Sequence, residues 1–249
     1  EFTVVGTSTA TNIQQWINKN ISGSVVASVD TNGIFNTTGG YNMAGLSALR
    51  QYSGQQSIFV GQGSGSAFNT DNSIYRNVGV GYNALSLATS SINNTAVVVT
   101  ALQNTRVIDG VSYHATNNTA LGYEAGQTNT SGFYNTFLGA ASGASNTTGG
   151  ANVFVGYNSG LNNTTGTENV AIGGKQSTVG TLNYNKTGSD NTSVGAGALA
   201  GSSGVNVNNN TALGWQAGYN VQANNNTLIG YQAGYDLTSG TQNIIIGYY

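Results

Sequence analysis

A nine-residue pattern of polar and apolar positions recurs along most of this chain. It has the form Asn-(Thr/Val/Ile)-x-(Leu/Val/Ile)-Gly-x-x-(Ala/Ser)-(Gly/Leu), and residues 118–126 are a clear copy. The central glycine, called the marker here, is replaced by valine in one copy, and the markers are Gly61, Gly81, Val98, Gly122, Gly139, Gly156, Gly173, Gly195, Gly214, Gly230 and Gly247. The differences between successive marker positions are 20, 17, 24, 17, 17, 17, 22, 19, 16 and 17. A basal period of 17 with insertions predicts a solenoid.

The positions three and one before each marker are β-branched or leucine in every copy, as in Val153/Val155 and Val170/Ile172. Residues two apart in a strand share one face of it. We therefore expect one short strand per copy, with both side chains inside a narrow core, and a second short strand elsewhere in each coil. The marker glycine allows a turn or a close approach of two backbones. A small residue suited to a tight interior corner follows three places later, at Ala84, Ala101, Ala125, Ser142, Ser159, Ala198, Ala217 and Ala233.

The residue between these two positions should then face outward. It is large and apolar in five copies, at Phe59, Phe137, Phe154, Leu228 and Ile245. Repeated apolar side chains on one face usually mark an interface. This assignment predicts a stripe that is covered by another chain or by the protein's own loops.

The N-terminal part has a different pattern. A β-prone run containing Phe2, Val4 and Val5 precedes a polar link that ends at residue 11, and two β-rich runs and an Asn-Gly turn follow within residues 12–36. That arrangement predicts a three-stranded meander that caps the solenoid. Residues 37–52 fit either a loop with one helical turn or an irregular coil. The expected organisation is thus a strand and link over 1–11, a β-meander cap over 12–52 and a β-solenoid over 53–249, all of it β structure.

Composition narrows the range of partners. Charged residues make up 6% of the chain and the net charge is −2, so we expect no nucleic-acid partner and no attraction to an anionic bilayer. The absence of cysteine excludes disulfides and thiolate metal sites. No run approaches the roughly 20 apolar residues of a membrane span, so we expect no membrane insertion.

Candidate chemistry is sparse. The single histidine, His114, shares the longest interval between markers with Arg106 and Asp109, and this loop is the one place suited to acid-base chemistry or to recognition. No nucleophile motif accompanies it. We expect a solvated loop, no enzymatic activity, no metal and no cofactor, and we keep the three residues as a candidate recognition loop.

Two side-chain columns follow from the repeat. Aromatic residues stand directly after the marker at Tyr82, Tyr123, Tyr157, Trp215, Tyr231 and Tyr248. They suit either a platform for sugar rings or, as we expect, a structural ladder. The asparagine that opens each copy, from Asn118 to Asn243, predicts a hydrogen-bonded amide ladder like those of stacked β structures.

At these residues the chain resembles the head domains of trimeric autotransporter adhesins, whose coils repeat a Ser-Val-Ala-Ile-Gly motif; residues 169–173, Asn-Val-Ala-Ile-Gly, are a near match. It is similar also to repeats of phage tail fibres and of large bacterial surface fibre proteins. The resemblance implies a left-handed parallel β-roll, often trimeric, that acts in surface attachment.

Together these features predict a structural subunit of an extracellular fibre or filament, located outside the cell, on its surface or on a virion. The alternative is a receptor-binding or adhesin module that recognises a cell-surface glycan or protein. For the fibre, the expected partner is a second copy joined head to tail. The apolar last repeat, with Ile244, Ile245 and Ile246, would accept the strand at Phe2, Val4 and Val5 of the next subunit by β-augmentation.

Overall fold

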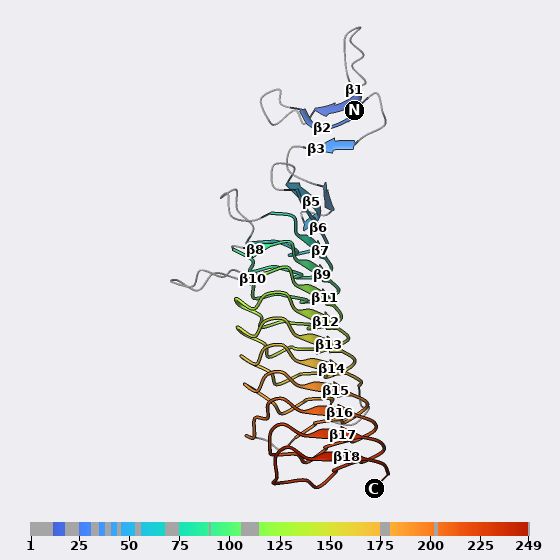
Figure 1. The fold of residues 1–249 in the computed structure, drawn as a ribbon. Coiled ribbons are helices and arrows are strands. Elements are labelled where there is room, and N and C mark those ends of the chain that lie inside the picture. The colour runs from blue at the N-terminus through green and yellow to red at the C-terminus, as the bar shows by residue number, and fades with distance from the viewer. Residues whose placement is uncertain are drawn as a thin grey trace.

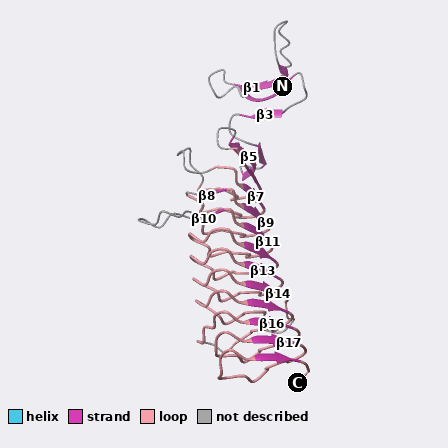
Figure 2. Cartoon of the chain, viewed as in Figure 1, coloured by secondary structure: helices cyan, strands magenta, loops and turns pink. Residues whose placement is uncertain are grey.

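The fold was analysed in a computed structural model. It describes residues 12–17, 25–30, 35–37, 41–43, 46–52, 56–67, 75–89, 91–105, 115–174, 180–201 and 204–248. These residues form strands, turns and extended segments, with no helix among them (Figures 1 and 2). The described part includes no helix that could cross a bilayer.

Eleven parallel strands stack along one wall of an elongated solenoid (Figure 1). Neighbouring strands pair in register, so that Thr136 faces Val153, and Leu138 faces Val155. Each strand belongs to one coil, which confirms the predicted parallel β-solenoid. The strands are β6 (Ser57–Val60), β7 (Val78–Val80), β9 (Thr95–Val97), β11 (Thr119–Leu121), β12 (Thr136–Leu138), β13 (Val153–Val155), β14 (Val170–Ile172), β15 (Thr192–Val194), β16 (Thr211–Leu213), β17 (Thr227–Ile229) and β18 (Ile244–Ile246).

The opposite wall differs from the expected second strand. In the described coils β8 (Ser91–Ile92) and β10 (Ala115–Thr116) pair there, and Tyr75 forms an isolated parallel bridge with Ile92. Further along, the wall is built from turns, and at two steps three consecutive backbone N–H groups converge on one carbonyl of the next coil. The N–H groups of Thr147, Thr148 and Gly149 donate to Thr164 O at 2.8, 3.1 and 3.3 Å. This geometry joins the coils without forming a strand ladder.

The N-terminal strands are antiparallel. The sheet β1-β2-β3 contains β1 (Asn12–Ile17), β2 (Val25–Asp30) and β3 (Phe35–Thr37). After it, β4 (Tyr41–Met43) pairs with β5 (Leu46–Tyr52), and β5 pairs with β6 at the end of the solenoid sheet. Most of 37–52 is thus strand, neither the helical turn nor the irregular coil that the sequence left open. Residues 1–11 lie outside the described residues.

The inward and outward faces of the strands are the reverse of the sequence assignment. The middle residue of each strand points into the coil: Phe59, Phe137, Phe154 and Leu228 are at most 1% exposed, and Ile245 packs against the same core. The flanking residues point out, so that Ile172 is 39% exposed. The predicted outward apolar stripe is therefore the core. The space between the walls of a coil holds one side chain from each strand. A strand of three residues fills this space with its middle side chain.

The core is filled by compensation between two inward positions. Where the middle residue is Phe154, the residue six places later is Gly160; where it is Ala96, that residue is Leu102. Both leucine and alanine of the second pair are fully buried. Large and small side chains combine in this way in several coils because close packing leaves little empty volume. Where both positions are small, as at Ala120 and Gly126, side chains of the neighbouring coils fill the space, since a Cβ at Gly126 would meet Phe137 and Leu102.

The predicted small corner residues are confirmed, since all eight are fully or almost fully buried. The marker glycines are also explained. Gly139 has a φ of 130°, and a Cβ there would meet the backbone of Gly156 at 2.8 Å. Val98, the exception, holds a φ of 90°, a conformation that is rare for a β-branched residue.

Gly160→Ala tests the compensation. A Cβ at this position would lie 2.5 Å from the ring of Phe154, and we expect the crowding to lower the free energy of unfolding by about 1–3 kcal/mol beyond the backbone term. Gly204→Ala is the matched control, because Gly204 has a φ of 89° and nothing within 4 Å of its added Cβ. Urea unfolding of both variants measures the difference. Equal losses would contradict the steric argument, and adding Phe154→Leu should restore part of the loss in Gly160→Ala alone.

Candidate interaction surface and its supporting ladders

A buried column of asparagines holds the coils in register. The predicted ladder is confirmed, and it begins two coils earlier than expected. Its members are Asn77, Asn94, Asn118, Asn135, Asn152, Asn169, Asn191, Asn210, Asn226 and Asn243. In β6, Ser57 takes the corresponding place, and its Oγ accepts from the backbone N–H of Asn77 at 3.0 Å.

Asn152 shows the bonding of one step. Its Oδ1 accepts from the backbone N–H of Asn169 at 3.0 Å and from Asn169 Nδ2 at 3.2 Å. Its Nδ2 donates to Asn135 Oδ1 at 3.1 Å and to Gly166 O, in the turn wall of the same coil, at 2.9 Å. The Asn152 amide thus joins three consecutive coils and braces its own coil internally. Because buried polar groups with partners rigidify a fold, the ladder fixes the positions of the strand residues beside it.

A second amide column in the turn wall was missed by the sequence analysis. Asn146 Nδ2 donates to Asn129 Oδ1 at 2.7 Å, and Asn163 Nδ2 donates to Asn146 Oδ1 at 2.8 Å. The column ends at Asn163 Oδ1, which is buried and has no hydrogen-bond partner. The signal was present in the repeated Asn-Thr-(Ser/Thr)-Gly sequences that start at these three asparagines.

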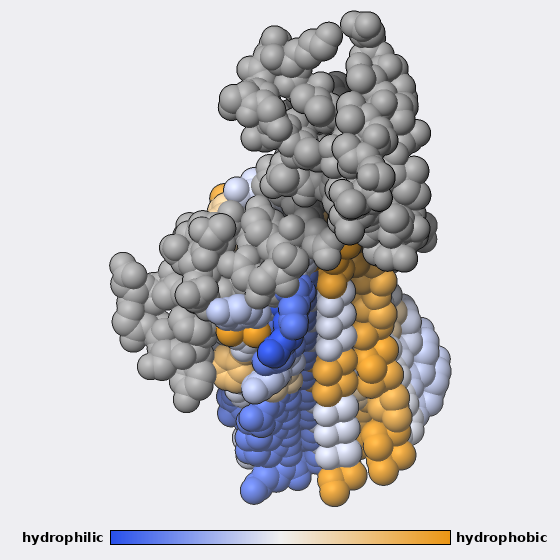
Figure 3. Space-filling view, turned by 90° about the horizontal axis from the view of Figure 1, so that it is seen from above, coloured by the Kyte–Doolittle hydropathy of each residue, from blue (hydrophilic) through white to orange (hydrophobic). Residues whose placement is uncertain are grey.

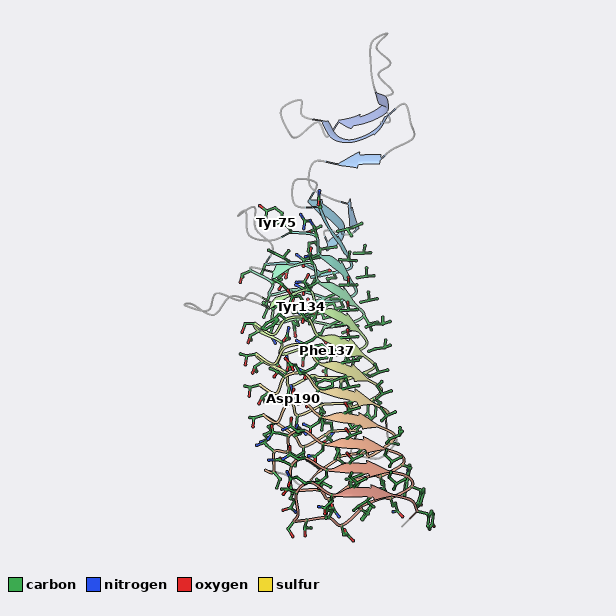
Figure 4. The ribbon with its side chains drawn as sticks, in the orientation of Figure 1. Tyr75, Tyr134, Phe137 and Asp190 are labelled. Carbon is green, nitrogen blue, oxygen red and sulfur yellow. The ribbon has the colours of Figure 1, made fainter. Side chains whose placement is uncertain are left out.

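The strand wall presents a continuous face to solvent. We call the residues three before, one before and one after each marker in β6–β18 the outer sheet face. Figure 3 shows two neighbouring columns along it, one uniformly hydrophobic and one in which hydrophobic and neutral residues mix. The first matches the position before the marker, which is always Val, Leu or Ile, and the second the position three before it, which is Val, Ile or Thr. Figure 4 shows side chains projecting outward from the strand wall. Phe137, which is labelled there, belongs to the buried middle position of its strand.

The third column of this face, directly after the marker, contains the aromatic residues, and three of them stack. Trp215 and Tyr231 have ring centroids 4.8 Å apart at 17°, and Tyr231 and Tyr248 lie 5.1 Å apart at 12°. Tyr123 and Tyr157 are exposed, with Ala140 and Gly174 at the equivalent positions of the following coils. In the three-ring stack the ring faces cover one another. The expected structural ladder therefore fits Trp215, Tyr231 and Tyr248, whereas Ala140 and Gly174 place no ring over Tyr123 and Tyr157 on that side.

The described tyrosines show two shifted pKa values. A hydrogen bond from Tyr123 to Glu124, aided by the carboxylate charge, raises the pKa of the exposed Tyr123 phenol. Burial, followed by Tyr235 and Tyr184, raises the pKa of Tyr219, whose ring stacks on Tyr235 at 5.1 Å. Both shifts disfavour ionisation of these two phenols.

The other predicted site residues separate into two groups. Ile244 and Ile246 are 75% and 71% exposed on the outer sheet face, whereas Ile245 packs inward. Phe2, Val4 and Val5, and the recognition loop with Arg106, Asp109 and His114, lie outside the described residues. In the part of the chain that is described, no three His, Cys, Asp or Glu residues cluster as metal ligands would.

These features define the class of the molecule as a parallel β-solenoid whose coils follow the period of the sequence repeat, with an internal amide ladder and an apolar outer sheet face. Comparison with known protein families, with curated proteins and with solved structures found no match.

Proposed function

We propose that this chain is a structural subunit of an extracellular fibre or filament. The observation that carries the proposal is the amide ladder, because it links every coil from β6 to β18 through buried hydrogen bonds. Stacked coils at about 4.8 Å each form a stiff rod on the order of 50 Å long. Such a rod suits a subunit that must resist mechanical force, since bending it would break buried amide contacts in several coils at once.

The surface chemistry supports the same role. The repeat presents the same side-chain types at the same positions in successive coils, with insertions at intervals such as those from Val98 to Gly122 and from Gly173 to Gly195. A repeated surface offers equivalent contacts along the rod, as a filament requires. Electron microscopy of the native material tests the proposal, and long filaments of constant width are expected. Short particles of fixed length would instead support the receptor-binding alternative.

Head-to-tail joining remains our prediction for filament growth. Deleting residues 1–11 should leave folded solenoids that no longer polymerise, because the strand proposed to dock on the next subunit is gone. Negative-stain microscopy measures filament formation, and circular dichroism together with the thermal midpoint checks the fold. A matched control replaces residues 1–11 by a Gly/Ser segment of equal length. Either variant forming normal filaments would contradict this mechanism.

A further inference from the structure

We infer that the outer sheet face is a lateral interface, and that its occupant is a second copy of this chain. The face contains no Asp, Glu, Lys or Arg in any of its eleven coils. Its positions hold aliphatic residues, threonine, glycine, aromatic residues and a single glutamine, Gln62. The face positions themselves carry no charge, and described charges such as Glu168 and Asp190 lie in the turns that precede ladder asparagines. Glu124 is the described charge that reaches the edge of the face, through its hydrogen bond to the Tyr123 phenol.

The face exposes large side chains that a solvated surface does not require. Before the last strand, seven aliphatic residues of the face are 36–48% exposed: Ile58, Val60, Val78, Leu121, Leu138, Ile172 and Leu213. With eleven coils at about 4.8 Å and a width of about four residues at 3.3 Å, the face covers on the order of 700 Å². This area approaches the roughly 800 Å² per partner of a standard stable interface. Within it the column before the marker is apolar in every coil, whereas six of the eleven residues three before the marker are threonine.

A second copy fits this face for three reasons. An uncharged face meets its own copy without repulsion between like charges. Both copies carry rows at the same strand spacing, so that side chains of one can enter the gaps of the other, as in dry interfaces between paired sheets. The face is one wall of a sheet, and two such walls pack at about 10 Å.

Other occupants fit less well. A phospholipid surface favours basic residues beside an apolar face, and nucleic acid requires them, yet the face has none. A sugar polymer would need a continuous row of free ring faces, but the rings of Trp215, Tyr231 and Tyr248 stack on one another. The other exposed rings of this column, Tyr82, Tyr123 and Tyr157, are separated by coils that carry Val99 and Ala140 at this position. A second copy needs neither, and it buries the exposed aliphatic columns along their whole length.

The inference deepens the proposed fibre function, because lateral contacts would join rods side by side within the fibre. The decisive variant is the triple substitution Leu138→Glu, Ile172→Glu and Leu213→Glu, which places three carboxylates on the face. The matched control carries Thr148→Glu, Thr187→Glu and Gln222→Glu. These control residues are exposed, lie away from the outer sheet face and belong to the same three coils. Light scattering coupled to size exclusion measures the mass of each protein.

We expect the parent and the control triple to have at least twice the 25.4 kDa chain mass, and the face triple to fall to the mass of one chain. A monomeric parent at 100 µM, or a face triple that keeps the parent mass, would overturn the inference. Because the chain has no cysteine, Leu213→Cys and Thr187→Cys give a second test that leaves the fold less disturbed. A short thiol crosslinker should yield covalent dimers of the first variant and not of the second, and equal yields would also overturn it.

The experiments can contradict the fibre function and the lateral interface independently of each other. If the parent is a lateral oligomer that forms no filaments under any condition tested, the fibre function is wrong while the interface stands. If the face triple forms filaments of parent width, the interface is wrong while the fibre function stands. Filaments that become thinner in the face triple alone would support both.

Discussion

Replacing Phe154 with alanine is expected to lower the free energy of unfolding by about 3–5 kcal/mol, the usual range for removing a fully buried phenylalanine. The ring is inaccessible to solvent, packs 5.8 Å from the ring of Phe137, and occupies the space left by Gly160. The cavity would remain because the amide ladder holds the walls apart. Urea unfolding and the thermal midpoint measure the loss. Hydrogen exchange should increase first in the coils that contain β12, β13 and β14.

Val155→Ala is the matched control, since Val155 is the next residue and points outward, where it is half-buried. We expect it to lower stability by less than about 1 kcal/mol, as surface substitutions do. Measuring both variants in the background of the face triple removes any contribution from self-association. If Val155→Ala were the more damaging of the two, the inward placement of Phe154 would be wrong.

The second large effect is expected at the ladder. Asn152→Leu keeps approximate size but removes the four hydrogen bonds of the side chain, to Asn135, Gly166 and Asn169. Asn169 would retain two buried donors without their acceptor, and each unsatisfied buried group costs about 1–3 kcal/mol. We therefore expect the free energy of unfolding to fall by roughly 2–6 kcal/mol. The register of neighbouring coils should loosen as well, which hydrogen exchange at the Asn169 amide reports directly.

Asn104→Ala provides the comparison, because Asn104 is half-buried and stands outside both amide columns. Its substitution should change the midpoint of urea unfolding only slightly. If Asn152→Leu were as stable as Asn104→Ala, the ladder would contribute little to stability. Packing of the inward side chains would then be what holds the coils together.

The repeat period by itself determined the architecture. Markers that recur at one basal period, each with a β-prone triplet before it, can stack only if every triplet pairs with the next, and that is the register seen between β12 and β13. The amide ladder and the small interior corners were predictable for the same reason. A residue repeated at one place in every coil meets its own copies, so its chemistry must suit a column. Asparagine suits a column of hydrogen bonds, and alanine suits a corner with no space.

Which face of each strand is buried was decided only by the tertiary structure. β-branched residues favour strands on either face, so Val153 and Val155 predicted a strand correctly and its direction wrongly. The narrow coil determines which face is buried, because its walls leave space for one side chain of each strand. Phe154 occupies that space and lies on the same inner face as the buried Asn152, two residues before it. Combining the inward ladder with the two-residue period of a strand would have given the right assignment. The compensation between Phe154 and Gly160 likewise depends on a contact across the coil, which spacing along the chain specifies only once the walls are in place.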